Sequence, residues 1–592
     1  MKGKKLNGAQ IFVESLKAEE VEVIFGYTGA KVINIYDQLY GSDIRQIMPH
    51  HEQGGIHAAD GYARSTGKVG VCLTTSGPGA TNLITGLATA YMDSVPLVAF
   101  TGQVNSWKLG TDAFQETDIT GISMPVTKHN YLVDDISKLA ETIKEAFYIA
   151  QNGRPGPVLI DITADVLTDE AEFSYPKDTD IVGYKTSNKD NMDEIKKAAD
   201  LINNAEKPVI YAGGGTIISG ADYILRELTE KAAIPVTTTL MGIGIFPRKD
   251  KLSLGMLGMH GTTEANLAVT NSDLIIALGA RFDDRVTGKL ETFAPGADII
   301  HVDIDSAEIG KLIEVDVAIV GDVKQTLMKL LPLIKERKLS RWNNKIKKWR
   351  ELDTIKGKSH TEDMKNSQDS GKNHTDKINP GMVIEELDKL IEGNAIITTE
   401  VGQHQMWAAQ YFRSIKPRSF ISSGGLGTMG YGFPAAVGAQ VGNPDETVIC
   451  IAGDGSLQMN IQELATIAKN KIPVKIIILN NQYLGMVRQW QELFYDKRYS
   501  QTCMRKQEGC PAQCSGPNKN CPEMVPNFIK VADGYGIKGK RVDASEDVRP
   551  ALKEALTGSG PYILDFIIGE EENVFPMVPA GGGLDDMLLD EH

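Results

Sequence analysis

The 592-residue sequence has no hydrophobic run near the ~18 residues that a membrane-spanning helix needs, so we expect no membrane partner. Basic residues are also in deficit: 62 Lys and Arg face 77 Asp and Glu, a net charge of -15, with no basic cluster of the kind that follows a phosphate backbone. This argues against nucleic acid as a partner. The start, Met1 to Lys5, is basic like a signal peptide, but residues 10–23 form an amphipathic, glutamate-bearing helix pattern instead of an apolar segment. We therefore expect a cytoplasmic protein.

The length suggests three or four domains at ~150 residues each. The first and last thirds resemble each other. A shift of 377 positions aligns residues 87–89 with 464–466, Pro96 with Pro473 and Gly77 with Asp454, without a gap. Both copies have the pattern of strand, glycine turn, helix and strand, so we expect one right-handed β-α-β unit used twice, with chance similarity as the alternative.

In the middle third, three apolar strands run directly into glycine or acidic residues. Segments 208–212, 274–278 and 299–302 lead into Gly213-Gly214-Gly215, Gly279-Ala280-Arg281 and Asp303. Such strand ends form a crevice where backbone amides bind phosphate and carboxylates bind ribose hydroxyls, which predicts a nucleotide site. We predict an α/β protein of three doubly wound parallel-sheet domains, residues 1–185, 186–345 and 378–592, with a polar linker at 346–377.

The most specific motif is Gly453-Asp454-Gly455-Ser456, with Asn481 following 27 positions after Asp454. Each would follow a strand, at the edge where open α/β sheets bind ligands. Two oxygen ligands there suit Mg²⁺, and the glycines let the backbone approach a diphosphate. The spacing resembles the thiamine-diphosphate motif, and an ordinary turn is the alternative interpretation.

Glu52 is the candidate acid for such a cofactor. His51-Glu52-Gln53-Gly54 follows the strand-like segment 44–48 and begins a helix. Thiamine diphosphate loses its thiazolium C2 proton to its own 4′-amino group once a carboxyl group hydrogen-bonds N1′ of the pyrimidine, so one glutamate in a dry pocket suffices. The alternative is that Glu52 only stabilises the positive end of the helix.

Further segments resemble the catalytic subunit of acetohydroxyacid synthase, also called acetolactate synthase, over essentially the whole length. They are residues 51–53, 77–82, 112–118, 255–261, 281–285, 402–407, 427–430, 485–490 and 577–581. A generic thiamine-diphosphate enzyme would share the metal motif and the glutamate, but not the middle segments or the Trp490 segment.

The resemblance implies a role for each matching position. Glu52, Gly29, Gln115, Met429 and Trp490 would act at the reacting centre. Met429 would bend the cofactor, unless it is ordinary core filling, and Trp490 would favour 2-ketobutyrate as the acceptor. Mg²⁺ would be held by Asp454, Asn481 and the Tyr483 carbonyl; the remaining cofactor contacts would be Gly402, Gln403, His404, Gln405, Gly453, Gly455, Ser456, Gly485 and Met486. A structural FAD would contact Arg154, Gly213, Gly214, Arg281 and Asp303.

The implied reaction condenses two pyruvates to 2-acetolactate with release of CO₂, or pyruvate with 2-ketobutyrate to 2-aceto-2-hydroxybutyrate, in branched-chain amino-acid biosynthesis. The family builds each site between two subunits, so we expect a homodimer or homotetramer, with a small regulatory subunit. Two alternatives stay open: another FAD-containing thiamine-diphosphate enzyme such as pyruvate oxidase, or a cofactor-binding paralogue with weak activity.

Two segments depart from the family pattern. Its Tyr-Pro-Gly-Gly loop is Tyr27-Thr28-Gly29-Ala30-Lys31 here, and its Pro-Lys-Asp is Thr163-Ala164-Asp165. The first change adds a lysine near the expected thiazolium position, and the second removes one from the substrate-access region. Both bear on substrate range and rate more than on fold or cofactor.

A third departure is an insertion at 503–522. It holds four of the 6 cysteines, namely Cys503, Cys510, Cys514 and Cys521. The other two, Cys72 and Cys450, lie in apolar strands. Clustered thiols in a cytosolic protein favour Zn²⁺ or an iron-sulfur cluster over disulfides. The spacing fits no standard zinc finger, so a loop of unligated thiols is the alternative.

Overall fold

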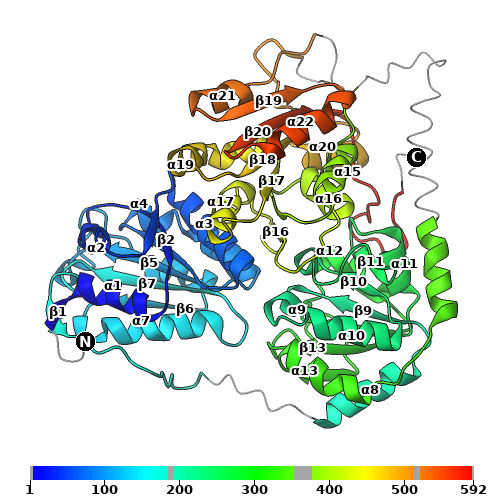
Figure 1. Ribbon diagram of the computed structural model, residues 1–592, viewed down its shortest axis with the longest axis horizontal. Helices are drawn as coiled ribbons and strands as arrows, with labels where there is room; N and C mark the ends of the chain where they lie inside the picture. The colour runs from blue at the N-terminus through cyan, green and yellow to red at the C-terminus, as the bar shows by residue number, and fades with distance from the viewer. Residues whose placement is uncertain are drawn as a thin grey trace.

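The computed structural model describes residues 5–184, 192–351, 377–511, 514, 516 and 520–589, which contain three six-stranded sheets flanked by helices (Figure 1). All paired strands within these sheets run parallel. Their central strands are short apolar runs buried along their whole length, as expected when helices cover both faces. The predicted α/β class with three parallel-sheet domains is confirmed.

The first and third sheets share one strand order. The first sheet runs β3-β2-β4-β5-β7-β6 and the third runs β16-β15-β17-β18-β20-β19, so both have the order 2-1-3-4-6-5 along the chain. The 377-position shift superimposes β4 and β5 on β17 and β18 to within two residues, which confirms the repeat. The strands are β2 (Val23–Tyr27), β3 (Arg45–Ile47), β4 (Gly70–Thr74), β5 (Leu97–Gln103), β6 (His129–Val133), β7 (Pro157–Thr163), β15 (Ile396–Thr399), β16 (Phe420–Ser422), β17 (Val448–Gly453), β18 (Lys475–Asn480), β19 (Lys538–Val542) and β20 (Tyr562–Ile567).

The middle sheet has the order β11-β10-β9-β12-β13-β14, which is 3-2-1-4-5-6 along the chain, the order of dinucleotide-binding folds. The strand order reverses between β9 and β12, the two strands that lead into the glycine-rich turns. The strands are β9 (Pro208–Ala212), β10 (Val236–Thr238), β11 (Ser253–Met256), β12 (Leu274–Leu278), β13 (Asp298–Asp303) and β14 (Val317–Val320).

Helices α3 (Glu52–Thr66) and α17 (Gly432–Gly442) join the first domain to the third (Figure 1). A Cβ on Gly61 would collide with the carbonyl of Ala435, and one on Gly438 would collide with the carbonyl of Ala58. Because only glycine permits this approach, the two helices pack backbone to backbone. One apolar cluster continues across both domains. Other helices are α1 (Gly8–Ala18), α7 (Ile136–Gln151), α8 (Met192–Asn204), α10 (Asp222–Ala232), α13 (Val323–Leu330), α15 (Pro380–Ile391), α16 (Gln403–Tyr411), α19 (Leu464–Asn470), α20 (Gly485–Phe494), α21 (Phe528–Gly534) and α22 (Val548–Thr557).

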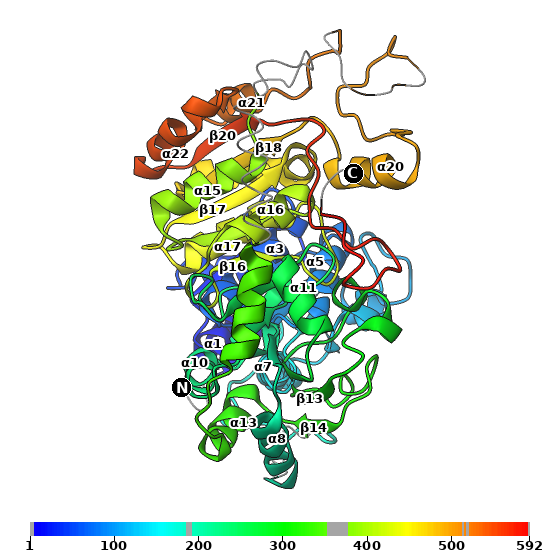
Figure 2. The same cartoon turned by 90° about the vertical axis from the view of Figure 1, so that its right-hand side faces the viewer.

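Two domain boundaries differ from those predicted. A helix continues through residues 340–351, and its Trp342 and Ile346 are buried in the core of the middle domain, so the linker begins after 351 and not at 346. The rest of the predicted linker, 352–376, lies outside the described residues. The C-terminal segment returns to the middle domain (Figure 2), where Val578 and Leu584 join the same core.

Candidate active site

A pocket opens where the strand order of the third sheet reverses, between β15 and β17. It brings together twelve predicted cofactor residues from the segments that follow β15, β16, β17 and β18: Gly402, Gln403, His404, Met429, Gly453, Asp454, Gly455, Ser456, Asn481, Tyr483, Gly485 and Met486. Gln405 does not line it. Its side-chain amide donates instead to Ser422 Oγ at 2.7 Å and to the Ser423 carbonyl at 3.3 Å.

Asp454 carries a buried carboxylate, one oxygen of which makes no hydrogen bond within the described residues. The residue begins α18 (Asp454–Leu457) and is 1% exposed, and the oxygen in question is Oδ2. Burial raises the pKa of Asp454 to about 8. Nearby, Asn481 Oδ1 accepts the Tyr483 N–H at 3.1 Å, which keeps a second lone pair free to face the pocket. An uncompensated buried carboxylate is costly, so a divalent cation bound by these oxygens fits the site.

The walls of the pocket leave no room for side chains at two glycines. A Cβ on Gly453 would lie 2.7 Å from His404 Nδ1, and one on Gly485 would collide with Gln403 Oε1. Backbone and not a side chain therefore lines the pocket at both positions, which fits a diphosphate bound against the main chain.

Glu400 supports this pocket and has no counterpart among the predicted residues. Its carboxylate is fully buried and accepts the N–H groups of Gly430 at 2.7 Å and Phe433 at 3.0 Å, which fixes the turn that carries Met429. Burial raises the pKa of Glu400 to about 7. The only sequence signal would have been an acidic residue directly after an apolar strand.

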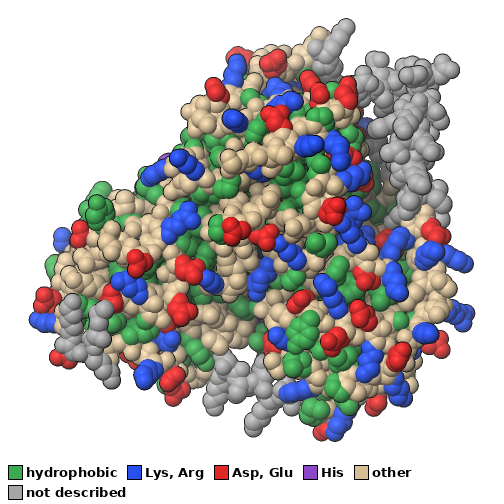
Figure 3. All heavy atoms as spheres, in the orientation of Figure 1, with side chains coloured by type: hydrophobic (Ala, Val, Ile, Leu, Met, Phe, Trp, Pro, Cys, Tyr) green, Lys and Arg blue, Asp and Glu red, His purple; other side chains and the backbone are tan. Residues whose placement is uncertain are grey.

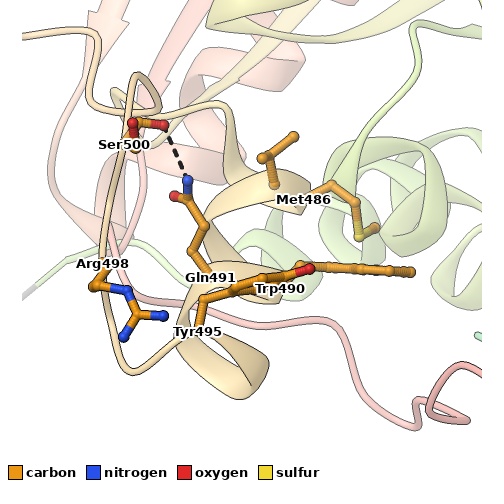
Figure 4. A pocket seen from close by; sticks show the side chains of 7 residues that line it. Met486, Trp490, Gln491, Tyr495, Arg498 and Ser500 are labelled. Carbon is orange, nitrogen blue, oxygen red and sulfur yellow. Dashed lines mark hydrogen bonds between the residues drawn. The ribbon is translucent and has the colours of Figure 1, made fainter.

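A second, apolar cavity of about 600 Å³ adjoins the first along α20. Met486, Trp490 and Tyr495 line it, and Gln491 Nε2 donates to the Ser500 carbonyl at 3.0 Å (Figure 4). The guanidinium of Arg285 lies 6.0 Å from the Trp490 ring. Trp490 therefore presents an apolar face next to a cation, an arrangement suited to a small 2-keto acid.

Glu52, Gln115 and Gly29 lie together on the first domain. Glu52 begins α3, and its Oε2 accepts a hydrogen bond from Asn82 Nδ2 at 2.9 Å. Gln115 has a φ of 62° and packs over Gly77, while a Cβ on Gly29 would lie 2.5 Å from Thr75. None of the three lines the pocket that contains Asp454. Within one chain, the two groups of predicted residues therefore do not line a common pocket.

The predicted FAD contacts converge at the reversal point of the middle sheet. Arg154 of the first domain pairs with Glu308 at 2.6 Å and with Asp305 at 3.3 Å, and the N–H of Asp305 donates to Asp303. Burial raises the pKa of Asp303 to about 6. The turn of Gly213 and Gly214 packs against the turn that leads into Arg281, because the N–H of Gly213 bonds to Leu278. Glycine turns and a buried carboxylate at a sheet crevice fit a dinucleotide.

Comparison with known proteins decides the family. Thiamine pyrophosphate enzyme models match residues 6–122 (N-terminal TPP binding domain), 195–330 (central domain) and 400–566 (C-terminal TPP binding domain). The acetolactate synthase large subunit of Corynebacterium glutamicum is 47% identical over 585 residues, 98% of this chain and 90% of the relative. Acetolactate synthase 1, chloroplastic, of Nicotiana tabacum is 47% identical over 589 residues, 98% and 85%. The probable acetolactate synthase large subunit of Methanococcus aeolicus is 46% identical over 603 residues, 99% and 96%. The chain belongs to the acetolactate synthase family of thiamine pyrophosphate enzymes.

The first two departures from the acetolactate synthase pattern, residues 27–31 and 163–165, lie in the first domain. The N–H of Lys31 donates to Thr75 Oγ1 at 3.3 Å. Thr163 is buried at the end of β7, and Asp165 accepts the N–H and hydroxyl of Ser106 at 2.9 and 2.6 Å. Asp165 therefore supports the loop that follows β5 and leads to Gln115.

The cysteine insertion begins beside Tyr483, one of the residues that line the pocket of Asp454. Cys503 forms an antiparallel bridge with Tyr483, and Met504 packs over Gly455. All four insertion cysteines are partly exposed, whereas Cys72 and Cys450 are buried. Across the described residues, which include all six cysteines, no group of three or more His, Cys, Asp or Glu is arranged to hold a metal ion. The arrangement gives the predicted four-cysteine metal site no support.

The distribution of charged side chains on the surface agrees with the lack of a basic cluster in the sequence. Basic and acidic side chains are mixed over all three domains on the face shown in Figure 3. Among the helices that the structure describes, none has the length and hydrophobicity to cross a membrane.

Proposed function

We propose that this chain is the catalytic subunit of an acetolactate synthase. It would condense two pyruvates to 2-acetolactate with release of CO₂, and pyruvate with 2-ketobutyrate to 2-aceto-2-hydroxybutyrate, in branched-chain amino-acid biosynthesis. The observation that carries the proposal is the buried carboxylate of Asp454, whose Oδ2 makes no hydrogen bond within the described residues, in one pocket with Asn481 at the reversal point of the third sheet. Relatives at 46–47% identity that bear this name support it.

Thiamine diphosphate, when bound, supplies the carbon that takes up the two-carbon unit left after pyruvate loses CO₂. Asp454, the Asn481 side chain and the Tyr483 carbonyl would hold Mg²⁺ on its diphosphate. Met429, fixed by the hydrogen bonds of Glu400 to its turn, would support the ring system from below.

Glu52 would hydrogen-bond N1′ of the pyrimidine and hold or release the proton at that atom. Its Oε2 accepts from Asn82, which leaves Oε1 for this contact. Because Glu52 is absent from the pocket of Asp454, a complete site needs a second copy of the chain. We therefore infer a homodimer as the minimum, with a homotetramer as the larger option. A small regulatory subunit is also expected, since relatives carry the name large subunit.

Trp490 would select the acceptor. Its ring faces the apolar cavity and would contact the extra methyl group of 2-ketobutyrate, while Arg285 would attract the carboxylate. FAD would lie in the crevice between β9 and β12 and would serve a structural role, with Arg154, Gly213, Gly214, Arg281 and Asp303 as its contacts.

The direct test measures 2-acetolactate produced from pyruvate by the purified chain, with thiamine diphosphate, Mg²⁺ and FAD added singly and together. We expect product only when thiamine diphosphate and Mg²⁺ are both present. Oxygen consumption with acetate or acetyl phosphate as product, and no acetolactate, would instead indicate an oxidase. Cofactor binding without any turnover of pyruvate would indicate an inactive paralogue.

A further inference from the structure

Helix α3, which begins at Glu52, has an incomplete N-terminal cap of its own. The side chain of His51 at the N-cap position accepts the N–H of Gln53 at 3.1 Å. In a complete capping box, a glutamate at the third helical position would also accept the N–H of the N-cap residue. That third position is Gly54, so the helix itself supplies no such group.

Glu463, from the other end of the chain, takes this place. It ends the 3₁₀ segment η7 (Gln458–Glu463), which follows the turn that carries Asp454. Its Oε1 accepts the N–H of His51 at 3.1 Å, and its two oxygens accept the N–H of His50 at 3.1 and 3.2 Å. A Cβ on Gly54 would collide with Glu463 Oε1, so the carboxylate occupies the space that a side chain at Gly54 would fill.

The carboxylate of Glu463 is itself held in one orientation. It is 1% exposed, and Thr466 Oγ1 donates to its Oε2 at 2.6 Å. Thr466 Oγ1 also lies 3.0 Å from His50 Nδ1, which ties the same segment a second time. Burial raises the pKa of Glu463 to about 7. A buried carboxylate of this kind is tolerated because donors surround it and because it faces the positive end of a helix.

We propose that Glu463 is a positioning residue for Glu52. It anchors His50 and His51, the two residues directly before Glu52, from a different domain, and thereby fixes where the first turn of α3 places the Glu52 carboxyl group. Glu463 touches neither substrate nor cofactor in this scheme. The inference rests on the proposed function only for the consequence in catalysis; the anchoring itself concerns the protein without ligands.

The first experiment measures amide hydrogen exchange of the ligand-free protein across residues 48–56. In Glu463→Ala we expect the amides of His50 and His51 to exchange about tenfold faster or more, because each loses a buried acceptor. Glu463→Gln, which retains one acceptor oxygen and the size of the side chain, should show a smaller increase. Asp388→Asn is the matched control: Asp388 is a fully buried carboxylate of the same domain that accepts from Arg413, and its loss should leave residues 48–56 unchanged. Unchanged exchange at His50 and His51 in both Glu463 variants would overturn the anchoring.

The second experiment separates positioning from general stability. Glu463→Ala should lower kcat about tenfold or more with the KM for pyruvate little changed. It should also slow exchange of the C2 proton of bound thiamine diphosphate, as we expect of Glu52→Gln. In the double variant the two losses should not multiply, because Glu463 acts through Glu52. Multiplying losses would overturn the proposal. Full activity of Glu52→Gln alone would overturn the role of Glu52 in the proposed function, while the exchange data would still decide the anchoring.

Discussion

The first and third domains use one strand order, yet they carry different chemistry at the same edge of the sheet. After β17 stands Asp454, buried and with an Oδ2 that makes no hydrogen bond within the described residues; after β4, at the matching position, stands Gly77, whose φ of 59° forms an open turn under Gln115. In the proposed function the third domain would therefore supply the cation site, and the first would supply a carboxyl group, Glu52, on a neighbouring helix. One duplicated scaffold would then provide both halves of the proposed site.

The interior of the two sheets preserves the shared origin more closely than their edges do. In the first sheet Gln103 Nε2 donates to Asp161 Oδ2 at 2.9 Å, and in the third sheet Asn480, 377 positions later, donates to Asp565 Oδ1 at 2.9 Å. The pairs differ in one respect: Asp565 also pairs with Arg541 at 3.0 Å, whereas the other partner of Asp161 is the Thr101 hydroxyl. The same strand order thus accommodates a charged partner, Arg541, for the buried aspartate of one sheet and an uncharged partner, Thr101, for that of the other. This difference can be tested.

The largest effect should come from Glu52→Gln in the first domain. We expect activity to fall by about 10²- to 10⁴-fold, because an amide cannot share the proton at N1′, with thiamine diphosphate and Mg²⁺ still bound. Steady-state assays together with cofactor titration check this. Near-normal turnover would remove Glu52 from the mechanism.

Asp454→Asn in the third domain should lower activity by at least about 100-fold at fixed Mg²⁺, because the cation loses a charged ligand. The cofactor-free protein should unfold at no lower a temperature than the parent, since Asp454 Oδ2 makes no hydrogen bond to lose. Calorimetry without Mg²⁺ measures this. A clear drop in the unfolding temperature would assign Asp454 a structural role instead.

Trp490→Leu concerns the acceptor and not the duplicated scaffold. It should reduce the preference for 2-ketobutyrate over pyruvate by about 1–3 kcal/mol at most, the worth of one methylene in an apolar pocket. Competition between the two acceptors, followed by product analysis, gives the ratio. An unchanged ratio would contradict the contact proposed for the indole.

Gly77→Asp copies the third-domain residue into the first domain. The change should create no cation site and should destabilise the protein by about 1–3 kcal/mol, because an aspartate would adopt a positive φ and its Cβ would lie 3.1 Å from Gln115. Chemical denaturation measures the loss of stability, and Mg²⁺ titration tests for a new cation site. A stable variant with a new Mg²⁺ site would mean that the two edges are interchangeable.

The smallest effect concerns the buried pair inside the first sheet. Burial raises the pKa of Asp161 to about 7 from its ordinary 3.8. Between about pH 4 and 7 the folded protein retains a proton that the unfolded chain has released, so Asp161 makes stability fall as pH rises through this window. Asp161→Asn should flatten that fall, because an amide does not titrate in this window. Asp565→Asn should instead destabilise the protein near pH 7, because Arg541 loses its carboxylate. Equal pH profiles for the two variants would contradict the comparison.

Much of this molecule could be predicted from local patterns in the sequence. Apolar runs of strand length that end in glycine or acidic residues predicted the three parallel sheets, and the spacing from Asp454 to Asn481 predicted the cofactor pocket, because strand ends and glycine turns are properties of neighbouring residues. The 377-position repeat could also be predicted from the sequence, because it rests on the same local patterns. Ile346 of the predicted linker and Val578 of the predicted third domain pack into the core of the middle domain, which their position along the chain does not indicate.

The tertiary structure alone decided which distant residues meet. Glu463 and Glu52 are 411 positions apart, and no periodicity connects them; only the close packing of α3 on α17 brings the carboxylate to the start of the helix. In the same way, only the tertiary structure shows that Glu52 does not line the pocket of Asp454 within one chain. Local sequence sets hydrogen-bonding capacity and side-chain chemistry. The meeting of distant groups depends on many weak contacts summed over whole domains, which no single motif encodes.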